Sequence, residues 1–224
     1  MYPNFKIVVD RNSTINKRLI IYSPFIIIVV NILVAILFGS IIGKWAFIPI
    51  ILVEWLMFLL FIHFQKKDHE HKKWLKSSIG KSKAFWATLC IIIGLIPLPI
   101  FLKHYHLLAD LTVFIPWFIL FMINPFLEEY YWRGVLLDQT KFWNSTISVL
   151  YSSILFSVNH AVFGINSELF RGYEVMASTF IMGLVWSITY KRTDTLRWVI
   201  LSHMLVDFLN LSSASFLDLY KPNF

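Results

Sequence analysis

Three short segments of the chain place ionisable side chains inside or beside strongly apolar runs. They are the sequences EEYYWR at 128–133, FSVNH at 156–160 and HMLVD at 203–207. Glu, Arg, His and Asp are rare within membrane-spanning segments, where they usually face a bundle interior or a wet cavity and have a function. The three segments together therefore predict an active site assembled from separate helices.

The first segment predicts an ion pair beside a free carboxylate. If 127–138 is helical, Glu129 and Arg133 lie four residues apart on one face, with the acid first, which is the favourable order. Glu128 is rotated by about 100° from Glu129 on a helix of 3.6 residues per turn. We therefore expect Arg133 to neutralise Glu129 and Glu128 to face a cavity as a candidate general base. A solvated charge cluster at a helix end is the alternative interpretation.

The other two segments repeat the spacing of four residues. Phe156 and His160 share one helix face, as do His203 and Asp207. An imidazole can activate water, bind a metal or hydrogen-bond a carbonyl oxygen, and a His–Asp pair can serve as a base with its orienting partner or stabilise an oxyanion. A single histidine in an apolar helix is more often a packing residue. The functional interpretation depends on all three segments occurring together.

The composition places these residues in a membrane. Of 224 residues, 58% are hydrophobic, 15% are charged and 21 are Phe, which is more apolar surface than a soluble domain of this length can bury. Apolar runs of spanning length predict an all-α, polytopic transmembrane helix bundle of about seven spans, with six to eight tolerable. The expected spans are 19–42, 46–64, 84–102, 111–127, 146–163, 175–190 and 198–217.

The fourth and fifth expected spans place two candidate residues at different depths. Counted from the start of each span at 1.5 Å per residue, Glu128 lies about 27 Å from one membrane face and His160 about 21 Å from the other. In a hydrocarbon core of about 30 Å, side chains do not bridge that difference. We therefore expect the fourth helix to begin near Pro116 or to break at Asn124-Pro125. In the third span, we expect a kink at Pro97 and Pro99.

The basic residues are concentrated in the loops expected on one side of the membrane. With the N-terminus inside, the segments 1–18, 65–83, 134–145 and 191–197 carry fifteen Lys and Arg, whereas the opposite loops carry four. This asymmetry predicts a cytoplasmic N-terminus. It also accounts for the net charge of +7 by topology and contact with the lipid bilayer, and we expect no nucleic-acid partner.

The ordered set EExxxR, FxxxH and HxxxD resembles the CPBP family of intramembrane proteases, which includes type II CAAX prenyl endopeptidases and bacterial Abi or bacteriocin-processing proteins. The resemblance covers roughly residues 111–217, which are the expected catalytic helix core. Residues 1–110 then form helices 1–3 with the basic loop 65–83, in a single integral membrane domain. The resemblance implies an endopeptidase that hydrolyses a peptide bond of a membrane-associated protein or peptide.

The resemblance also implies a role for each position. Glu128 activates the attacking water with help from His160, and His203 with the residue at 207 stabilises the oxyanion. The related prenyl endopeptidases have Asn at that last position, where this chain has Asp207. Because an ionised Asp cannot donate a hydrogen bond, Asp207 must either be protonated or orient His203, and we expect the second. The residues implied to support the site structurally are Glu129, Arg133 and Phe156.

The expected chemistry uses no metal and no cofactor. The alternative is a zinc metalloprotease, in which Glu128, His160 and His203 bind Zn²⁺ and leave one position for water. The HExxH motif of many zinc proteases does not occur in the sequence.

Two other functional classes share these features. A bacteriocin self-immunity or scaffold protein of the same fold would act by binding a partner. A proton-relaying transporter would also bury acids, but the sequence lacks the inverted halves typical of that class. Frequent Ile, Lys, Phe and Asn indicate an AT-rich genome. We therefore expect a bacterial cell membrane and, as partner, a membrane-associated peptide or protein.

Some polar residues receive no catalytic role. His63 and the sequence DHEH at 68–71 lie in or beside the lysine-rich loop, where we expect solvated side chains rather than a metal site. Glu54 lies within the second expected span, without an evident partner. Cys90 is the single cysteine, so no disulfide can form within the chain.

Overall fold

The computed structural model describes residues 11–65, 74–76 and 81–211, and in these residues the chain is helical and has no strand, which confirms the all-α class. The basic loop, with the DHEH sequence, lies largely outside the described residues. The helices are α1 (Arg11–Ile42), α2 (Phe47–Phe64), α4 (Lys81–Gly94), α5 (Leu98–His104), α6 (Leu111–Glu129), α7 (Leu137–Gln139), α8 (Ser145–Ala161), α9 (Tyr173–Thr193) and α10 (Arg197–Leu209).

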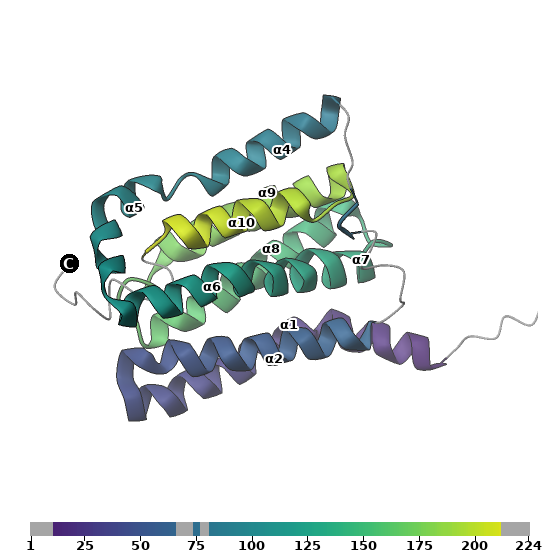
Figure 1. Cartoon of the computed structure of the whole chain (residues 1–224). Coiled ribbons are helices and arrows are strands. Elements are labelled where there is room, and N and C mark those ends of the chain that lie inside the picture. Colours follow the sequence, from purple (N-terminus) through teal and green to yellow (C-terminus); the bar gives the residue numbers. More distant parts are fainter. Residues whose placement is uncertain (1–10, 66–73, 77–80, 212–224) are drawn as a thin grey trace, which may run out of the picture.

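The long helices run roughly along one direction and form a bundle (Figure 1). A hairpin of α1 and α2 lies at one edge, α4 and α5 lie at the opposite edge, and α6, α8, α9 and α10 fill the space between them. In this central part α10 packs against both α4 and α6, while α9 packs against α8 and α4. The three segments with the candidate residues therefore come together in the middle of the bundle.

Two glycines allow sharp turns or close packing. Gly43, in the turn between α1 and α2, has a φ of 58°, in the left-handed region that favours glycine. A Cβ at Gly94 would lie 2.8 Å from the backbone oxygen of Ser202, so only glycine permits this approach of α4 to α10. The helix is interrupted directly after Gly94 and resumes at Leu98, so the expected kink at Pro97 is confirmed.

The helix α6 begins at a side-chain cap. Asp110 accepts hydrogen bonds from the hydroxyl and the backbone N–H of Thr112, at 2.7 and 2.9 Å. These hydrogen bonds lower the pKa of the Asp110 carboxyl. The helix then continues through Pro116 and Pro125. Neighbouring helices and local adjustments compensate for the backbone hydrogen bonds that proline removes from a membrane helix. The expected start near Pro116 and the expected break at Asn124-Pro125 are therefore wrong.

The length of this fourth helical stretch explains how the site assembles. The residues Tyr130–Leu136 are π-helical and join α6 to α7, so the helical stretch ends at Gln139 and not at 127 as expected. Glu128 consequently lies well inside the stretch, and its carboxylate comes within 3.9 Å of the His160 ring of α8. The depth estimate took the start of the stretch as a membrane face, whereas 29 residues at 1.5 Å each span about 44 Å, which exceeds a hydrocarbon core of about 30 Å.

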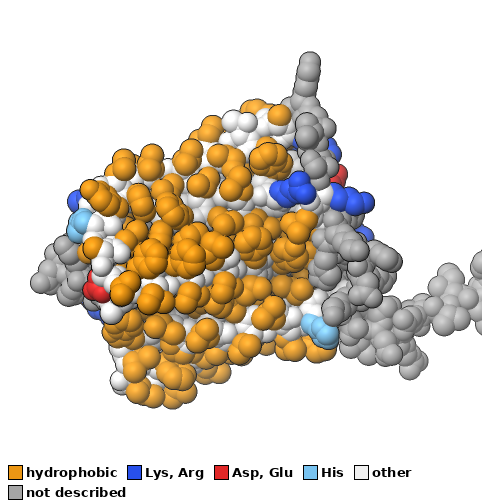
Figure 2. All heavy atoms as spheres, in the orientation of Figure 1, with side chains coloured by type: hydrophobic (Ala, Val, Ile, Leu, Met, Phe, Trp, Pro, Cys, Tyr) orange, Lys and Arg blue, Asp and Glu red, His pale blue; other side chains and the backbone are white. Residues whose placement is uncertain are grey.

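The bundle is apolar on its outside. Figure 2 shows hydrophobic side chains over most of one face, with Lys and Arg gathered mainly at one end. Helices α9 and α10 are not among the described stretches that are long and apolar enough to cross a membrane, so the expected count of seven spans is not confirmed. The predicted last span, 198–217, corresponds to α10, and its residues from 212 onward lie outside the described part. The qualifying stretches are Lys17–Phe64, which contains most of α1 and all of α2, Lys83–Ala109, Leu111–Gln139 and Ser145–Ile165.

Candidate active site

Glu129 and Arg133 form the ion pair that their spacing predicts. The Arg133 Nη1 donates to Glu129 Oε1 at 2.9 Å, and neither side chain is exposed. His203 Nδ1 lies 2.8 Å from the same oxygen. Because a carboxylate oxygen can only accept, the Nδ1 of His203 carries the proton. Glu129 of α6 therefore holds both the arginine of the adjoining π-helical turn and the histidine of α10.

Aromatic rings complete the surroundings of the arginine. The guanidinium carbon of Arg133 lies 4.3 Å from the ring centre of Phe156 and 5.2 Å from that of Trp186, both within the range of cation–π attraction. The Phe156 ring also lies 4.3 Å from the His160 ring. Phe156 thus links the buried arginine to the histidine one turn further along α8. The π-helical turn that carries Arg133 is a feature often found at functional sites.

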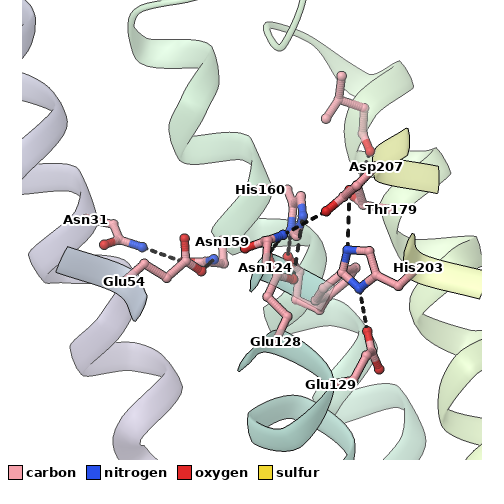
Figure 3. A network of polar contacts seen from close by, with 12 residues as sticks. Asn31, Glu54, Asn124, Glu128, Glu129, Asn159, His160, Thr179, His203 and Asp207 are labelled. Atoms are coloured by element: carbon pink, nitrogen blue, oxygen red, sulfur yellow. Dashed lines mark hydrogen bonds and ion pairs between the residues drawn. The ribbon is translucent and has the colours of Figure 1, made fainter. Parts of the chain in front are cut away.

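Glu128 and His160 face each other as two acceptors. Glu128 Oε1 accepts a hydrogen bond from Asn124 Nδ2 at 3.0 Å, and Glu128 Oε2 lies 3.9 Å from His160 Nε2 (Figure 3). The His160 Nδ1 lies 2.9 Å from the Phe156 carbonyl oxygen, to which it donates. In the neutral ring, the Nε2 then has a free lone pair that faces Glu128.

A small cavity adjoins these two groups. Its volume is about 30 Å³, which is enough for one water molecule. Glu128 Oε2 has no hydrogen-bond partner among the described residues. The arrangement can therefore hold a water between a carboxylate and an imidazole. The residues that line this cavity are Ile51, Glu54, Leu120, Asn124, Glu128, His160, Phe163, Phe170 and Asp207.

Asp207 and Glu129 lie at opposite ring nitrogens of His203. The Asp207 Oδ1 lies 3.6 Å from His203 Nε2, within the range of an ion pair but too long for a hydrogen bond. The closer carboxylate is Glu129 at Nδ1, and the Trp186 ring stacks on the His203 ring at 4.5 Å. The orienting role of Asp207 stays a prediction, and Glu129 is a second partner of His203 that the sequence analysis did not identify.

Asn124 is a site residue that the sequence analysis did not identify. Its Nδ2 donates to Glu128 Oε1 at 3.0 Å and to Asp207 Oδ2 at 3.2 Å, so it joins the two carboxylates. Its Oδ1 accepts from Trp55 Nε1 at 2.9 Å. A usable signal was present, because Asn124 lies four residues before Glu128 and thus on the same helix face. It was interpreted only as part of a helix break.

A larger cavity leads away from the site. It has a volume of about 500 Å³ and lies between the α4–α5 connection, α9 and α10. His160, His203 and Asp207 form part of its wall, and most of the remaining lining is apolar. The catalytic candidates are therefore accessible to a group larger than water.

The three zinc ligands considered from the sequence are Glu128, His160 and His203. In the part of the chain that the structure describes, no group of three or more His, Cys, Asp or Glu side chains is placed to hold a metal ion. Hydrolysis without a metal stays a prediction.

Comparison with known proteins finds a family match for the segment that carries the motifs. Residues 110–209 match the family model described as type II CAAX prenyl endopeptidase Rce1-like. The matched segment begins at the residue that caps α6, ends with α10 and contains all three motifs. We assign this segment to that family of proteases, and the resemblance to the CPBP family is confirmed. No curated protein and no solved structure matches the chain.

Proposed function

We propose that the protein is an intramembrane endopeptidase that hydrolyses a peptide bond of a membrane-associated protein or peptide, using a water activated by Glu128 and His160. One observation carries this proposal. Two acceptor atoms, Glu128 Oε2 and His160 Nε2, lie 3.9 Å apart beside a cavity of about 30 Å³. The family of residues 110–209 supports the reaction class.

The separation of these acceptors suits a bridging water. A water about 2.8 Å from both atoms would see them at an angle of about 90°, close to the angle between its two O–H bonds. Such a water donates one hydrogen to each acceptor, and its lone pairs stay available for attack. The short distance between Glu128 and His160 is thus a property that a water-activating pair requires.

The positions of four groups support the following reaction. Glu128 takes a proton from the water as the water oxygen attacks the carbonyl carbon of the substrate. The doubly protonated ring of His203, held at Nδ1 by Glu129, donates its Nε2–H to the oxyanion. Glu128 then returns the proton to the nitrogen as the carbon–nitrogen bond breaks, so no net proton is consumed. Asp207, 3.6 Å from His203 Nε2, supplies negative charge beside that ring.

The larger cavity suggests the nature of the substrate. Its apolar lining includes Ile93, Ile96 and Ile100 from the α4–α5 region and Met182 from α9, and it suits an apolar chain or side chain presented from the membrane. The description of the matched family names CAAX prenyl endopeptidases. A prenylated peptide that ends in a CAAX sequence is therefore the first substrate to test.

The test compares one variant with a matched control. An internally quenched CAAX peptide, with and without its prenyl group, is incubated with protein in lipid vesicles. Glu128→Gln should lower kcat by about 10²- to 10⁴-fold, the usual contribution of general acid–base catalysis. Glu168→Gln, at an exposed position between α8 and α9, should cleave at the rate of the unchanged protein. A Glu128→Gln variant with undiminished biological activity would contradict the proposal and indicate a binding function.

A further inference from the structure

Glu54 is a buried acid outside the matched segment. It lies in α2 and is only 2% exposed. Contrary to the sequence expectation, it has a partner, because its Oε1 accepts a hydrogen bond from Asn159 Nδ2 at 2.5 Å (Figure 3). Asn159 directly precedes His160 in α8. A buried acid within a membrane helix is rare unless it has a function.

Asn159 is itself held in one orientation. Its Oδ1 accepts from Asn31 Nδ2 of α1 at 3.0 Å, and Asn159 is not exposed. Because the carbonyl end of the amide is occupied by Asn31, the NH₂ end is directed at Glu54. Glu54 Oε1 is thus fixed as an acceptor, and the second carboxyl oxygen remains for another contact.

The second carboxyl oxygen of Glu54 can make a contact in the small cavity. Glu54 lines the same space of about 30 Å³ as Glu128 and His160. The ionisable groups that face this space come from four helices: Glu54 from α2, Glu128 from α6, His160 from α8 and Asp207 from α10. A water held there by Glu128 and His160 therefore shares this small space with Glu54.

The charges of the cluster leave Glu54 as the neutral acid. Glu129 is paired with Arg133 and Asp207 lies beside His203, whereas Glu128 is the carboxylate that the proposed function requires as the base. Among the described residues, no Lys, Arg or His forms an ion pair with Glu54. A buried carboxyl without a counter-charge keeps its proton, because burial of an isolated charge is costly. Since Oε1 accepts from Asn159, the proton belongs on Oε2.

We propose that Glu54 is the third ligand of the attacking water and donates its Oε2–H to the water oxygen. This role of Glu54 rests on the proposed function of the protein as an endopeptidase. A water that donates to Glu128 and His160 and accepts from Glu54 has one lone pair left. Three fixed contacts then direct that lone pair towards the substrate, and the reaction itself keeps the same proton balance.

Two substitutions separate this role from simple packing. In Glu54→Gln, the amide oxygen can accept from Asn159 and the NH₂ group can donate to the water, so this conservative variant should restore most of the kcat that Glu54→Leu loses. In Glu54→Leu, the water loses a ligand, and kcat should fall by about 10²-fold at unchanged KM, the usual cost of misplacing a reacting group. The probe is the quenched CAAX peptide, and Glu128→Gln is measured in parallel.

Infrared spectroscopy provides a readout that does not depend on turnover. At neutral pH, the unchanged protein in lipid should show the C=O stretch of a protonated carboxyl, which Glu54→Gln removes and Glu128→Gln retains. The proposal is overturned if Glu54→Leu keeps the full kcat, if Glu54→Gln is as inactive as Glu128→Gln, or if the band survives in Glu54→Gln. If Glu54→Leu does not fold, Glu54→Gln and the infrared band decide. An active Glu128→Gln would instead overturn the proposed function.

Discussion

The buried pair of Glu129 and Arg133 makes a prediction about stability that is separate from catalysis. Neither side chain is exposed, and Glu129 Oε1 receives two hydrogen bonds, at 2.9 Å from Arg133 and at 2.8 Å from His203. In Glu129→Gln, the volume is kept but the charge is removed, so Arg133 stays buried without its counter-charge. Removing one partner of a buried ion pair costs about 3–5 kcal/mol. We expect a loss of this size in the free energy of unfolding.

The double variant tests whether the loss comes from the unpaired charge. When Arg133→Gln is added to Glu129→Gln, no uncompensated charge remains at this point, and two amides can hydrogen-bond to each other. The double variant should therefore lose less stability than the sum of the single variants, with a coupling of about 0.5–3 kcal/mol, as contacting residues show. Unfolding by a denaturing detergent, followed by circular dichroism, measures all three variants.

The control is a glutamate of the same type at the surface. Glu168→Gln should change the free energy of unfolding by less than about 0.5 kcal/mol, as most exposed substitutions do. Glu128→Gln should also stay folded, because its amide can still accept from Asn124. The reasoning is refuted if Glu129→Gln costs less than about 1 kcal/mol, or if the costs of the two single substitutions simply add.

Two further predictions concern the chemistry and the membrane placement. The Asp207→Asn variant should cleave the CAAX peptide at a rate similar to that of the unchanged protein, because the new amide oxygen can accept from Asn124 and its NH₂ can donate to an oxyanion. Chelation of metal ions by EDTA should not affect cleavage by the unchanged protein. About one equivalent of bound zinc, with activity lost both on chelation and in Asp207→Asn, would favour a metalloprotease. For topology, a membrane-impermeant maleimide should label Glu174→Cys but not Lys76→Cys in intact cells, and both after permeabilisation. The native Cys90 is buried and gives no background; labelling of Lys76→Cys alone from outside would reverse the orientation.

Local features of the chain could be predicted from the sequence. The spacing of four residues was sufficient to predict the Glu129–Arg133 pair, because residues four apart on a helix are neighbours whatever the rest of the fold does. The apolar composition was sufficient to predict an all-α bundle for a membrane. The order of the three motifs identified the family of residues 110–209, which the family match confirms.

The ends of the helices were harder to predict from the sequence, because contacts between helices decide where each helix ends. The stretch that contains Glu128 continues through Pro125 and a π-helical turn to Gln139. Proline usually interrupts a helix, so a reading of the chain alone placed a break where neighbouring helices maintain the structure. The unbroken stretch brings the Glu128 carboxylate within 3.9 Å of the His160 ring without the expected break.

Contacts between distant helices were decided by the tertiary structure alone. Glu54 and Asn159 are 105 residues apart in the chain, and Asn31 and Asn159 are 128 apart. Asn124 links Glu128 to Asp207 across 83 residues. No periodicity in the sequence connects such positions, because helical spacing relates only residues within a few turns. The sequence by itself supplied the acids and histidines, whereas the packing of α2, α6, α8 and α10 decided which of them share one cavity.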